Sequence, residues 1–256
     1  MVEEFLKTRV STFDDLITRK GVERGNTLLV SGGCGTGKTV ITLQSLYNGA
    51  LAVERGIYIS LVEDPDKIKR HMKSNFGWDI EPLEAKGLIS IQKIDPFALA
   101  DDITSMYENE RNLSSPDAGL FKASRGELSL VDSRKIKIPF KPDRIAIDSI
   151  SSLEAAFTNK EYYRMYLQTM LEALSKHNSV NFLISEIEQE PDKYSKSGVE
   201  EFLVDGVIVL YNLRKGQMRR RALEILKLRS SDHVKELVPY MITAEGITIL
   251  AGDKVF

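Results

Sequence analysis

The segment NTLLVSGGCGTGKTVITLQSL, residues 26–46, decides the fold of this chain. An apolar run is followed by a glycine-rich turn and then by Lys38 and Thr39, which fits the pattern G-x-x-x-x-G-K-[ST] of a phosphate-binding loop. Glycines allow backbone N–H groups to turn inward around a phosphate, and the N-terminus of the following helix adds partial positive charge. The segment therefore predicts a strand, a loop and a helix that together bind a nucleotide.

Eight consecutive residues of this loop are expected to contact the nucleotide: Gly33, Cys34, Gly35, Thr36, Gly37, Lys38, Thr39 and Val40. The ammonium group of Lys38 can reach the β- and γ-phosphates of ATP, and the hydroxyl of Thr39 can coordinate Mg²⁺. The alternative is a glycine-rich turn with a chance Lys-Thr pair, which the flanking strand and helix patterns disfavour. ATP and Mg²⁺ are therefore the expected ligands.

The composition is that of an ordinary globular protein of 256 residues, 42% hydrophobic and 28% charged. The formal net charge is −2 and the sequence pI is about 6.0, so the overall charge favours neither nucleic acid nor a membrane as a partner. No run approaches the roughly 18 apolar residues of a membrane span, and the N-terminus has no apolar signal core, so we expect a cytoplasmic protein. The single cysteine, Cys34, excludes an intrachain disulfide framework, and its place in the loop favours a small space-filling residue over a redox switch.

Strand-like and helix-like patterns alternate along most of the chain, which predicts a mostly parallel sheet flanked by helices, an α/β fold. The part after residue 206 is rich in strand patterns and predicts antiparallel C-terminal strands. The expected helices cover residues 40–52, 66–75, 96–110 and 161–176, and the expected strands cover 57–62, 88–94, 144–148, 180–185, 206–210, 221–228 and short pieces near 240 and 246–250. One domain over residues 1–256 explains this pattern better than two.

Residues 111–141 interrupt the alternation. Seven Lys or Arg residues stand there against three acids without a helical stripe, and residues 128–131 and 135–140 could pair as a hairpin. A structureless loop of this length is unusual inside a core, so we interpret the segment as an insertion.

Two carboxylates near strand ends complete the predicted site. Asp148 ends the apolar strand 144–148, as in a Walker B element whose carboxylate holds the magnesium shell. Strand-terminal aspartates also cap helices, but the upstream loop favours the metal role, because the carboxyl ends of parallel strands meet at one sheet edge. Glu63 follows strand 57–62, which we expect beside the phosphate loop, and is the candidate for polarising the attacking water. Its alternative role is a solvated acid in the first turn of a helix.

Seven segments carry a resemblance to a known family: SGGCGTGKT at 31–39, LQSLYNGA at 43–50, YISLVEDP at 58–65, FGWD at 76–79, IAIDSISSL at 145–153, VEEFLVDGVIVL at 199–210 and EILKLRSSDH at 224–233. In this order they resemble the KaiC family of RecA-superfamily ATPases in its single-domain form. They cover nearly the whole chain apart from residues 111–141. The resemblance implies a RecA-like P-loop core that binds ATP.

The resemblance also implies that hydrolysis is weak. The family usually carries two successive glutamates after its second strand, and the first aligns with the catalytic glutamate of RecA-like proteins. In this chain that first position is Val62, which cannot activate water, and only Glu63 remains. Either Glu63 reaches the water, or the protein mainly uses ATP as a structural ligand in regulation or assembly and turns it over slowly.

A basic segment near the C-terminal end implies a site shared between subunits. The family's K-L-R-G-T-x-H corresponds to residues 227–233, with Lys227, Arg229 and His233 at the matching positions and two serines in place of Gly-Thr. In relatives the basic residues reach the γ-phosphate of the neighbouring subunit, as arginine fingers do. The resemblance therefore implies a homo-oligomeric, hexameric ring, with His233 among the nucleotide contacts. An exposed edge strand with protective charges is the alternative.

Nucleic acid is not an expected partner. The loops that bind DNA in RecA relatives correspond to residues 150–158, with one acid and no Lys or Arg, and 186–201, with six acids against two lysines. Such loops repel phosphates. A recombinase-like DNA-binding ATPase is therefore a third hypothesis, which rests on the basic insertion and on Arg219, Arg220 and Arg221.

Overall fold

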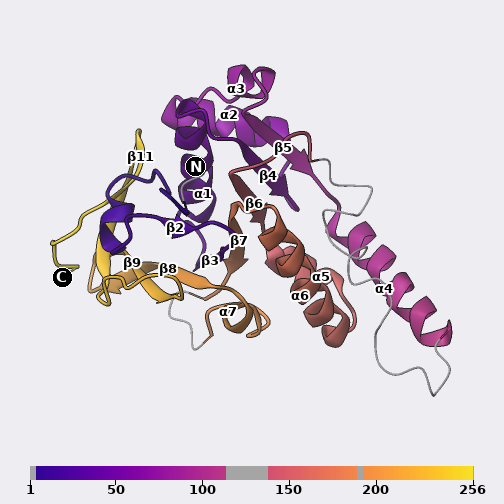
Figure 1. Cartoon of the computed structure of the whole chain (residues 1–256). Coiled ribbons are helices and arrows are strands. Elements are labelled where there is room, and N and C mark those ends of the chain that lie inside the picture. Colours follow the sequence, from indigo (N-terminus) through magenta and orange to yellow (C-terminus); the bar gives the residue numbers. More distant parts are fainter. Residues whose placement is uncertain (1–3, 114–137, 189–192, 256) are drawn as a thin grey trace.

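The computed structural model describes residues 4–113, 138–188 and 193–255. Two short strands near the N-terminus, β1 (Phe5–Leu6) and β2 (Val22–Glu23), pair with each other. The other strands form one nine-stranded sheet in the order β11 (Gly246–Ile249), β10 (Val238–Thr243), β9 (Met218–Leu228), β8 (Gly206–Lys215), β3 (Thr27–Gly32), β7 (Val180–Glu186), β6 (Arg144–Asp148), β4 (Gly56–Ser60) and β5 (Ile89–Lys93). Neighbouring strands are parallel from β8 to β5 and antiparallel from β8 to β11 (Figure 1). The predicted α/β fold with antiparallel C-terminal strands is confirmed.

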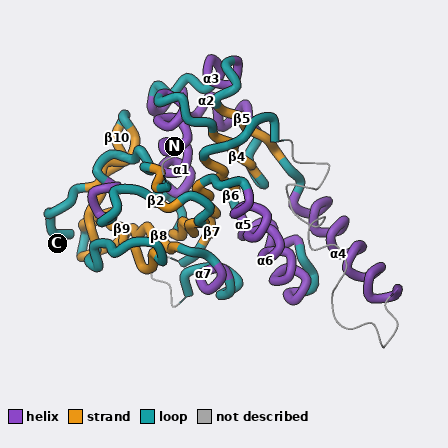
Figure 2. Tube along the Cα trace, viewed as in Figure 1, coloured by secondary structure: helices purple, strands orange, loops and turns teal. Residues whose placement is uncertain are grey.

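Helices cover both faces of the sheet (Figure 2). One face carries α1 (Lys38–Leu51), α2 (Pro65–Phe76), α3 (Glu81–Ala85) and the 3-10 helix η1 (Phe13–Leu16), and the other carries α4 (Pro96–Leu113), α5 (Ile150–Ala156) and α6 (Lys160–Lys176). The short α7 (Glu200–Leu203) precedes β8. In the described part of the chain, no helix is both long enough and apolar enough to cross a membrane.

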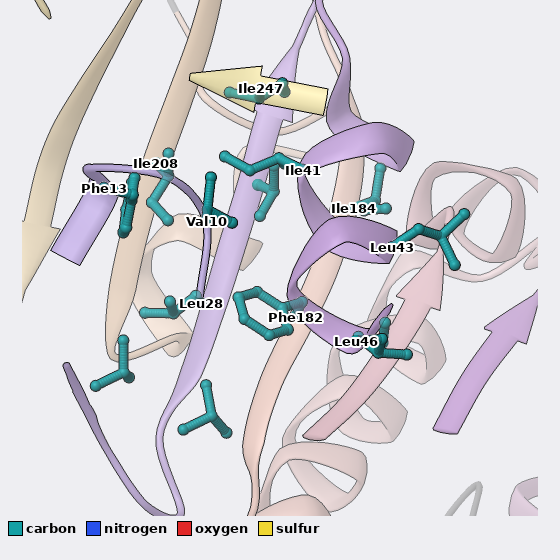
Figure 3. Close-up of a cluster of buried hydrophobic side chains, with 14 of the residues drawn as sticks. Val10, Phe13, Leu28, Ile41, Leu43, Leu46, Phe182, Ile184, Ile208 and Ile247 are labelled. Atoms are coloured by element: carbon teal, nitrogen blue, oxygen red, sulfur yellow. The ribbon is translucent and has the colours of Figure 1, made fainter. Parts of the chain in front are cut away.

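The core under α1 fixes the helix that follows the phosphate loop (Figure 3). Ile41 and Leu46 of α1 are buried in one cluster with Leu28 of β3 and Phe182 of β7, and Phe13 joins them from the N-terminal segment. Burying one large apolar side chain contributes roughly 1.5–3 kcal/mol. This layer therefore holds the start of α1, and the loop before it, over the carboxyl ends of the strands.

Strand alternation decides which side chains reach the α1 face at the sheet edge. Along β7, Phe182 and Ile184 belong to the core on the α1 side, whereas Leu183 belongs to the opposite core. Strand β6 alternates in the same way, since its residue 146 lies in the first core and 145 and 147 in the second. Because side chains on a strand repeat with a period of two, the last residues of β7 and β6, Glu186 and Asp148, lie on the α1 face.

Two strands separate the phosphate loop from the strand that precedes Glu63. In the sheet, β7 and β6 lie between β3 and β4. The expectation that Glu63 follows the strand beside the loop is therefore wrong. Sequence order does not give spatial order in a parallel sheet, because a crossover connection leaves room for strands that come later in the chain. On this side of the loop the adjacent strand is β7, which ends in Glu186.

Helix α2 has a clear cap at each end. The side chain of Asp64 accepts a hydrogen bond from the N–H of Asp66 at 3.0 Å, and Pro65 is the first helical residue. Gly77, with φ of 68°, ends the helix. Glu63 thus stands directly before a well-defined helix start, between the end of β4 and the cap of α2.

Most of the expected insertion lies outside the described residues. Residues 111–113 are the last turn of α4, and residues 114–137, with most of the expected hairpin, are not described. The division of the chain into one domain with an insertion therefore stays a prediction. Strands β8 and β9 are longer than expected, because β8 extends to Lys215 and β9 begins at Met218.

Candidate nucleotide-binding site

The loop between β3 and α1 forms a closed turn at the carboxyl edge of the sheet. Gly35 and Gly37 have φ of 72° and 95°, in the left-handed region that favours glycine. Thr36 is buried and donates a hydrogen bond from Oγ1 to the carbonyl oxygen of Gly33 at 2.9 Å. Helix α1 starts at Lys38, and the N–H groups of a first helical turn have no intrahelical partner. The loop therefore presents backbone donors and the positive end of a helix, the arrangement that binds a phosphate.

The remaining predicted contacts of the loop differ in exposure. Cys34 is exposed at the tip of the loop. Val40, in the first turn of α1, packs partly buried against the core on the α1 side. Of these two, Cys34 is the one whose side chain a ligand can reach directly.

Strand β10 supports the loop from the side. Tyr240 donates a hydrogen bond from Oη to the carbonyl oxygen of Thr36 at 2.5 Å. A Cβ atom placed on Gly37 would lie 2.8 Å from Cδ1 of Ile242. The side chain of Ile242 thus fills the space that any larger residue at position 37 would need. The antiparallel C-terminal strands therefore help to hold the phosphate loop in shape.

Lys38 is held by the loop to which it belongs. Its Nζ donates to the carbonyl oxygens of Gly32 and Gly33, at 2.8 and 3.0 Å. Burial lowers the pKa of Lys38, and the charges of Glu186 and Asp148 act in the opposite direction. The ammonium group is therefore near two carboxylates at the entrance of the loop.

Thr39 and Asp148 meet at the same edge. Oγ1 of Thr39 donates to Oδ2 of Asp148 at 2.7 Å, and Oη of Tyr58 donates to the same oxygen at 2.5 Å. Burial raises the pKa of Asp148, although these two hydrogen bonds act to lower it. A cation beside the carboxylate would stabilise its charged form.

This pair of oxygen atoms fits Mg²⁺. Magnesium prefers oxygen ligands and is usually bound by one or two carboxylates together with substrate phosphates, rather than by a cage of protein groups. Among the described residues, no three His, Cys, Asp or Glu side chains gather as a metal site. Thr39 and Asp148 therefore suit a magnesium ion that arrives with a nucleotide.

Glu63 lies at this edge but has a partner of its own. Its carboxylate forms an ion pair of 3.3 Å with Lys67, one turn further along α2, and its side chain is 41% exposed. Burial and the charge of Asp148 raise the pKa of Tyr58, and Glu63 adds a smaller contribution. Ser60, at the end of β4, pairs with Asp148, so Glu63 follows the strand that lies next to Asp148. Val62, at the position where the resemblance expects a glutamate, is 56% exposed.

Lys227 and Arg229 lie at the other end of the sheet. Lys227 pairs with Val207, which pairs with Leu29 of β3, three residues before the end of that strand at Gly32. Three strand residues span about 10 Å, and the two strand spacings from β9 to β3 add about 10 Å across the sheet. Arg229 follows further in the same direction. Within one chain, neither cation lies beside its own phosphate loop.

Both cations bind oxygen atoms around the end of α7. Nζ of Lys227 donates to the carbonyl oxygens of Val204 at 2.6 Å and Glu201 at 3.1 Å. The guanidinium of Arg229 donates to the carbonyl oxygen of Phe202 at 3.4 Å and forms an ion pair of 3.5 Å with Oδ1 of Asp205. Burial lowers the pKa of Lys227, and the charge of Arg229 adds to this effect. His233, the third predicted residue of the segment, pairs through its backbone with Ile17 of the N-terminal segment.

Comparison with known proteins identifies the family. The family described as "ATPase: KaiC" matches residues 6–254. The chain belongs to the KaiC ATPase family. The circadian clock oscillator protein KaiC of Synechococcus elongatus is 30% identical to it over 95% of this chain and 44% of its own length. The KaiC protein of Nostoc sp. is 32% identical over 96% of this chain and 44% of its own length. The chain thus spans less than half the length of these curated relatives.

A solved structure of a KaiC-like protein has the same fold. The crystal structure of PH0186 from Pyrococcus horikoshii OT3 matches with a TM-score of 0.73 at 28% identity, over 96% of this chain and 98% of that one. The resemblance to the KaiC family predicted from the sequence motifs is therefore confirmed.

Within this KaiC-family chain, the predicted residues fall into two groups. The loop, Lys38, Thr39 and Asp148 gather at one edge with Glu63 nearby. Lys227 and Arg229 lie at the other end, and His233 pairs with the N-terminal segment. Sequence reasoning missed Glu186 and Tyr240. Glu186 ends an apolar strand, the same signal that identified Asp148, and could have been found in that way. The contact of Tyr240 with the loop joins residues 204 positions apart and leaves no local signal.

Proposed function

We propose that this chain is a magnesium-dependent ATPase of low activity that works in a homo-oligomeric, hexameric ring. One observation carries the proposal: the hydroxyl of Thr39 and the carboxylate of Asp148 meet at 2.7 Å, next to Lys38 at the entrance of a glycine-rich loop. P-loop enzymes hold magnesium with a hydroxyl and a carboxylate of this kind and the phosphates with the lysine. Membership of the KaiC ATPase family supports the same interpretation.

The loop and Lys38 bind and orient the phosphates. Backbone N–H groups of residues 33–40 donate to phosphate oxygens, and the positive end of α1 favours their charge. Lys38 exchanges the carbonyl oxygens of Gly32 and Gly33 for the β- and γ-phosphates, so its ammonium stays paired throughout. Thr39 and Asp148 hold Mg²⁺, which when bound draws negative charge from the phosphate oxygens.

The water that attacks the γ-phosphorus needs a carboxylate to orient it. Glu63 is the candidate from the sequence, and its position after the strand that lies next to Asp148 supports a place near the metal. Its ion pair with Lys67 restrains it, and Val62 supplies no second acid. Slow turnover is the expected consequence.

Lys227 and Arg229 act, in this proposal, on the nucleotide of a neighbouring subunit. Their distance from their own loop and the exposed guanidinium of Arg229 support a role in trans. Phe202, beside them on α7, is 72% exposed, and Leu226 is 41% exposed, so apolar side chains accompany the cations on this surface. Such a surface meeting a different one on the next copy forms a heterologous interface, which closes into a ring. An edge strand with protective charges is the alternative.

Phosphate release from ATP tests the enzymatic part of the proposal. We expect release that depends on magnesium and is abolished in Lys38→Ala, because the γ-phosphate loses its direct cation. Lys73→Ala is the matched control, since Lys73 forms an exposed ion pair with Asp79 away from the loop and should leave the rate unchanged. Equal release by wild type and Lys38→Ala contradicts the proposal.

A regulatory or assembly protein that uses ATP as a structural ligand is the second candidate. The exposed Val62, in a position where the family usually has glutamate, favours it. Measuring the oligomer mass with and without ATP, alongside turnover, separates the two candidates. Assembly driven by ATP without phosphate release supports the second candidate, and turnover that needs assembly supports the first.

A further inference from the structure

We propose that Glu186, rather than Glu63, is the carboxylate that orients the attacking water in this site. The inference rests on the proposed ATPase function and adds a catalytic residue to it. Three features of β7 lead to it: the place of the strand in the sheet, the face that its last residue occupies and, within the residues that the structure describes, the lack of a partner for that residue's carboxylate.

Strand β7 lies between the loop strand and the Asp148 strand. Glu186 pairs with Gly32, the last residue before the loop, whereas Asp148 pairs with Ile184. Glu186 therefore stands two residues, or about 7 Å, beyond Asp148 along the strand direction. The carbonyl oxygen of Gly32 accepts hydrogen bonds from Nζ of Lys38 and from the N–H of Ile187, at 2.8 and 3.3 Å. One oxygen atom thus joins the lysine to the end of β7.

The face of the strand directs Glu186 toward the same side as α1. Phe182 and Ile184 lie in the core under α1, and Glu186 follows them at the same period of two. The negative charges of Glu186 and Asp148 both act to raise the pKa of Lys38. Both residues therefore lie on the side of the sheet that carries the lysine expected to hold the γ-phosphate.

The Glu186 backbone is fixed while its carboxylate remains available. Its N–H donates to Oγ of Ser151 at 2.8 Å, and Oγ of Ser151 lies 3.3 Å from Oγ of Ser185. Within the described residues, the Glu186 carboxylate makes no hydrogen bond or ion pair, and the residue is exposed. Glu63 differs in this respect, because its carboxylate forms an ion pair of 3.3 Å with Lys67.

The proposed step is a single in-line displacement. The carboxylate of Glu186 accepts a proton from water while the water oxygen forms a bond to the γ-phosphorus. The bond from the γ-phosphorus to the bridging oxygen breaks, and ADP leaves with that electron pair. Glu186 then returns the proton to solvent, so that ATP and water give ADP, phosphate and one proton. A carboxylate in such a role contributes about 10²–10⁴ to the rate.

The decisive comparison is Glu186→Gln with Glu63→Gln in the full chain. We expect kcat to fall about 100-fold in Glu186→Gln and to stay within about threefold of wild type in Glu63→Gln. Equilibrium binding gives a readout apart from activity. Removing an anion that faces the γ-phosphate should strengthen binding of a non-hydrolysable ATP analogue by about threefold or more and leave ADP affinity unchanged.

Glu186→Asp separates a charge effect from a positional one. It keeps the negative charge but withdraws it by one methylene, so we expect a lowered kcat with wild-type affinities for both nucleotides. Normal turnover in Glu186→Gln, or an equal loss in Glu63→Gln, overturns the inference while leaving the ATPase proposal intact. A wild-type protein that releases no more phosphate than Lys38→Ala overturns both.

Discussion

The two ends of the parallel sheet differ in which predicted site residues they carry and in what those residues contact. At the carboxyl end, Lys38, Thr39 and Asp148 contact one another or the loop within 3.0 Å, around a space that suits phosphates and a metal ion. At the opposite end, Lys227 and Arg229 contact oxygens of the stretch 201–205, at 2.6–3.5 Å, and Phe202 stands exposed beside them. One end gathers the residues predicted to hold phosphates and a metal ion, and the other carries cations and exposed apolar side chains.

This contrast indicates how phosphate binding and charge neutralisation can be divided between two copies of the chain. Phosphate binding needs backbone donors and a helix end, which a local segment provides. Neutralising the charge that develops on the γ-phosphate needs a cation on the far side of it, and the chain's own cations of the segment 227–233 are at the wrong end of the sheet to supply it. A head-to-tail arrangement of copies would bring the two ends together.

The largest expected effect is that of Arg229→Ala. A trans-acting arginine contributes about 10³–10⁵ to turnover, so we expect a loss of at least about 10³ in kcat with ATP affinity changed much less. Mixing this variant with Lys38→Ala in equal amounts should restore activity, because a Lys38→Ala subunit still offers Arg229 to its neighbour's intact loop. About a quarter of the interfaces in a random mixture would pair correctly.

Arg219→Ala is the matched control, because Arg219 lies at the turn between β8 and β9, opposite Arg214, and not at the 201–205 stretch. Its kcat should remain at the wild-type level. If Arg229→Ala is inactive and mixing does not restore phosphate release, Arg229 acts only within its own chain, through its contacts with Phe202 and Asp205. Full activity in Arg229→Ala would show that turnover does not need Arg229 from the other end of the sheet.

The sequence predicts best the features that are local. The loop at 33–40 lies within one short segment and has the predicted form, a glycine-rich turn between a strand and a helix. The place of Glu63 was wrong because strand order depends on which crossovers skip a neighbour, and no short pattern records this. In the sequence, Glu186 begins the acidic segment 186–201, whereas in the fold it is the last residue of the apolar strand β7.

The next largest effect should appear in stability, at the start of β6, the end opposite Asp148. Arg144, only 1% exposed, begins β6 and forms an ion pair of 2.6 Å with Glu54, which also pairs with Arg9 at 2.6 Å. Glu54→Gln leaves a buried guanidinium without its anion, so we expect a loss of about 3 kcal/mol in the free energy of unfolding. Denaturant titration measures it. Asp15→Asn is the control, because the exposed Asp15–Lys20 pair should contribute at most about 0.5 kcal/mol.

The same carboxylate predicts how stability depends on pH. Burial acts to raise the pKa of Glu54, but the hydrogen bonds and charges of Arg9 and Arg144 outweigh it, so the pKa is lowered from 4.5. A lowered pKa gives stability that is present above the unfolded value and is lost as the pH falls through the folded one. Wild type should therefore lose its advantage over Glu54→Gln below about pH 4.5. If the Glu54–Arg144 pair and the phosphate loop are energetically independent, the nucleotide affinity of Glu54→Gln near neutral pH stays within about twofold of wild type.

The smallest expected effect tests whether the antiparallel strands shape the nucleotide edge. Tyr240→Phe removes only the hydroxyl that donates to the carbonyl oxygen of Thr36, a bond that should be worth about 1 kcal/mol. Tyr211→Phe is the matched control, since its hydroxyl donates to Glu224 across the β8–β9 pair instead of to the carbonyl oxygen of Thr36. We expect ATP and ADP to bind about fivefold more weakly to Tyr240→Phe and normally to Tyr211→Phe. Because both nucleotides share the β-phosphate that the loop surrounds, a loss confined to ATP would mean that Tyr240 acts on the γ-phosphate side of the site and does not shape the loop itself.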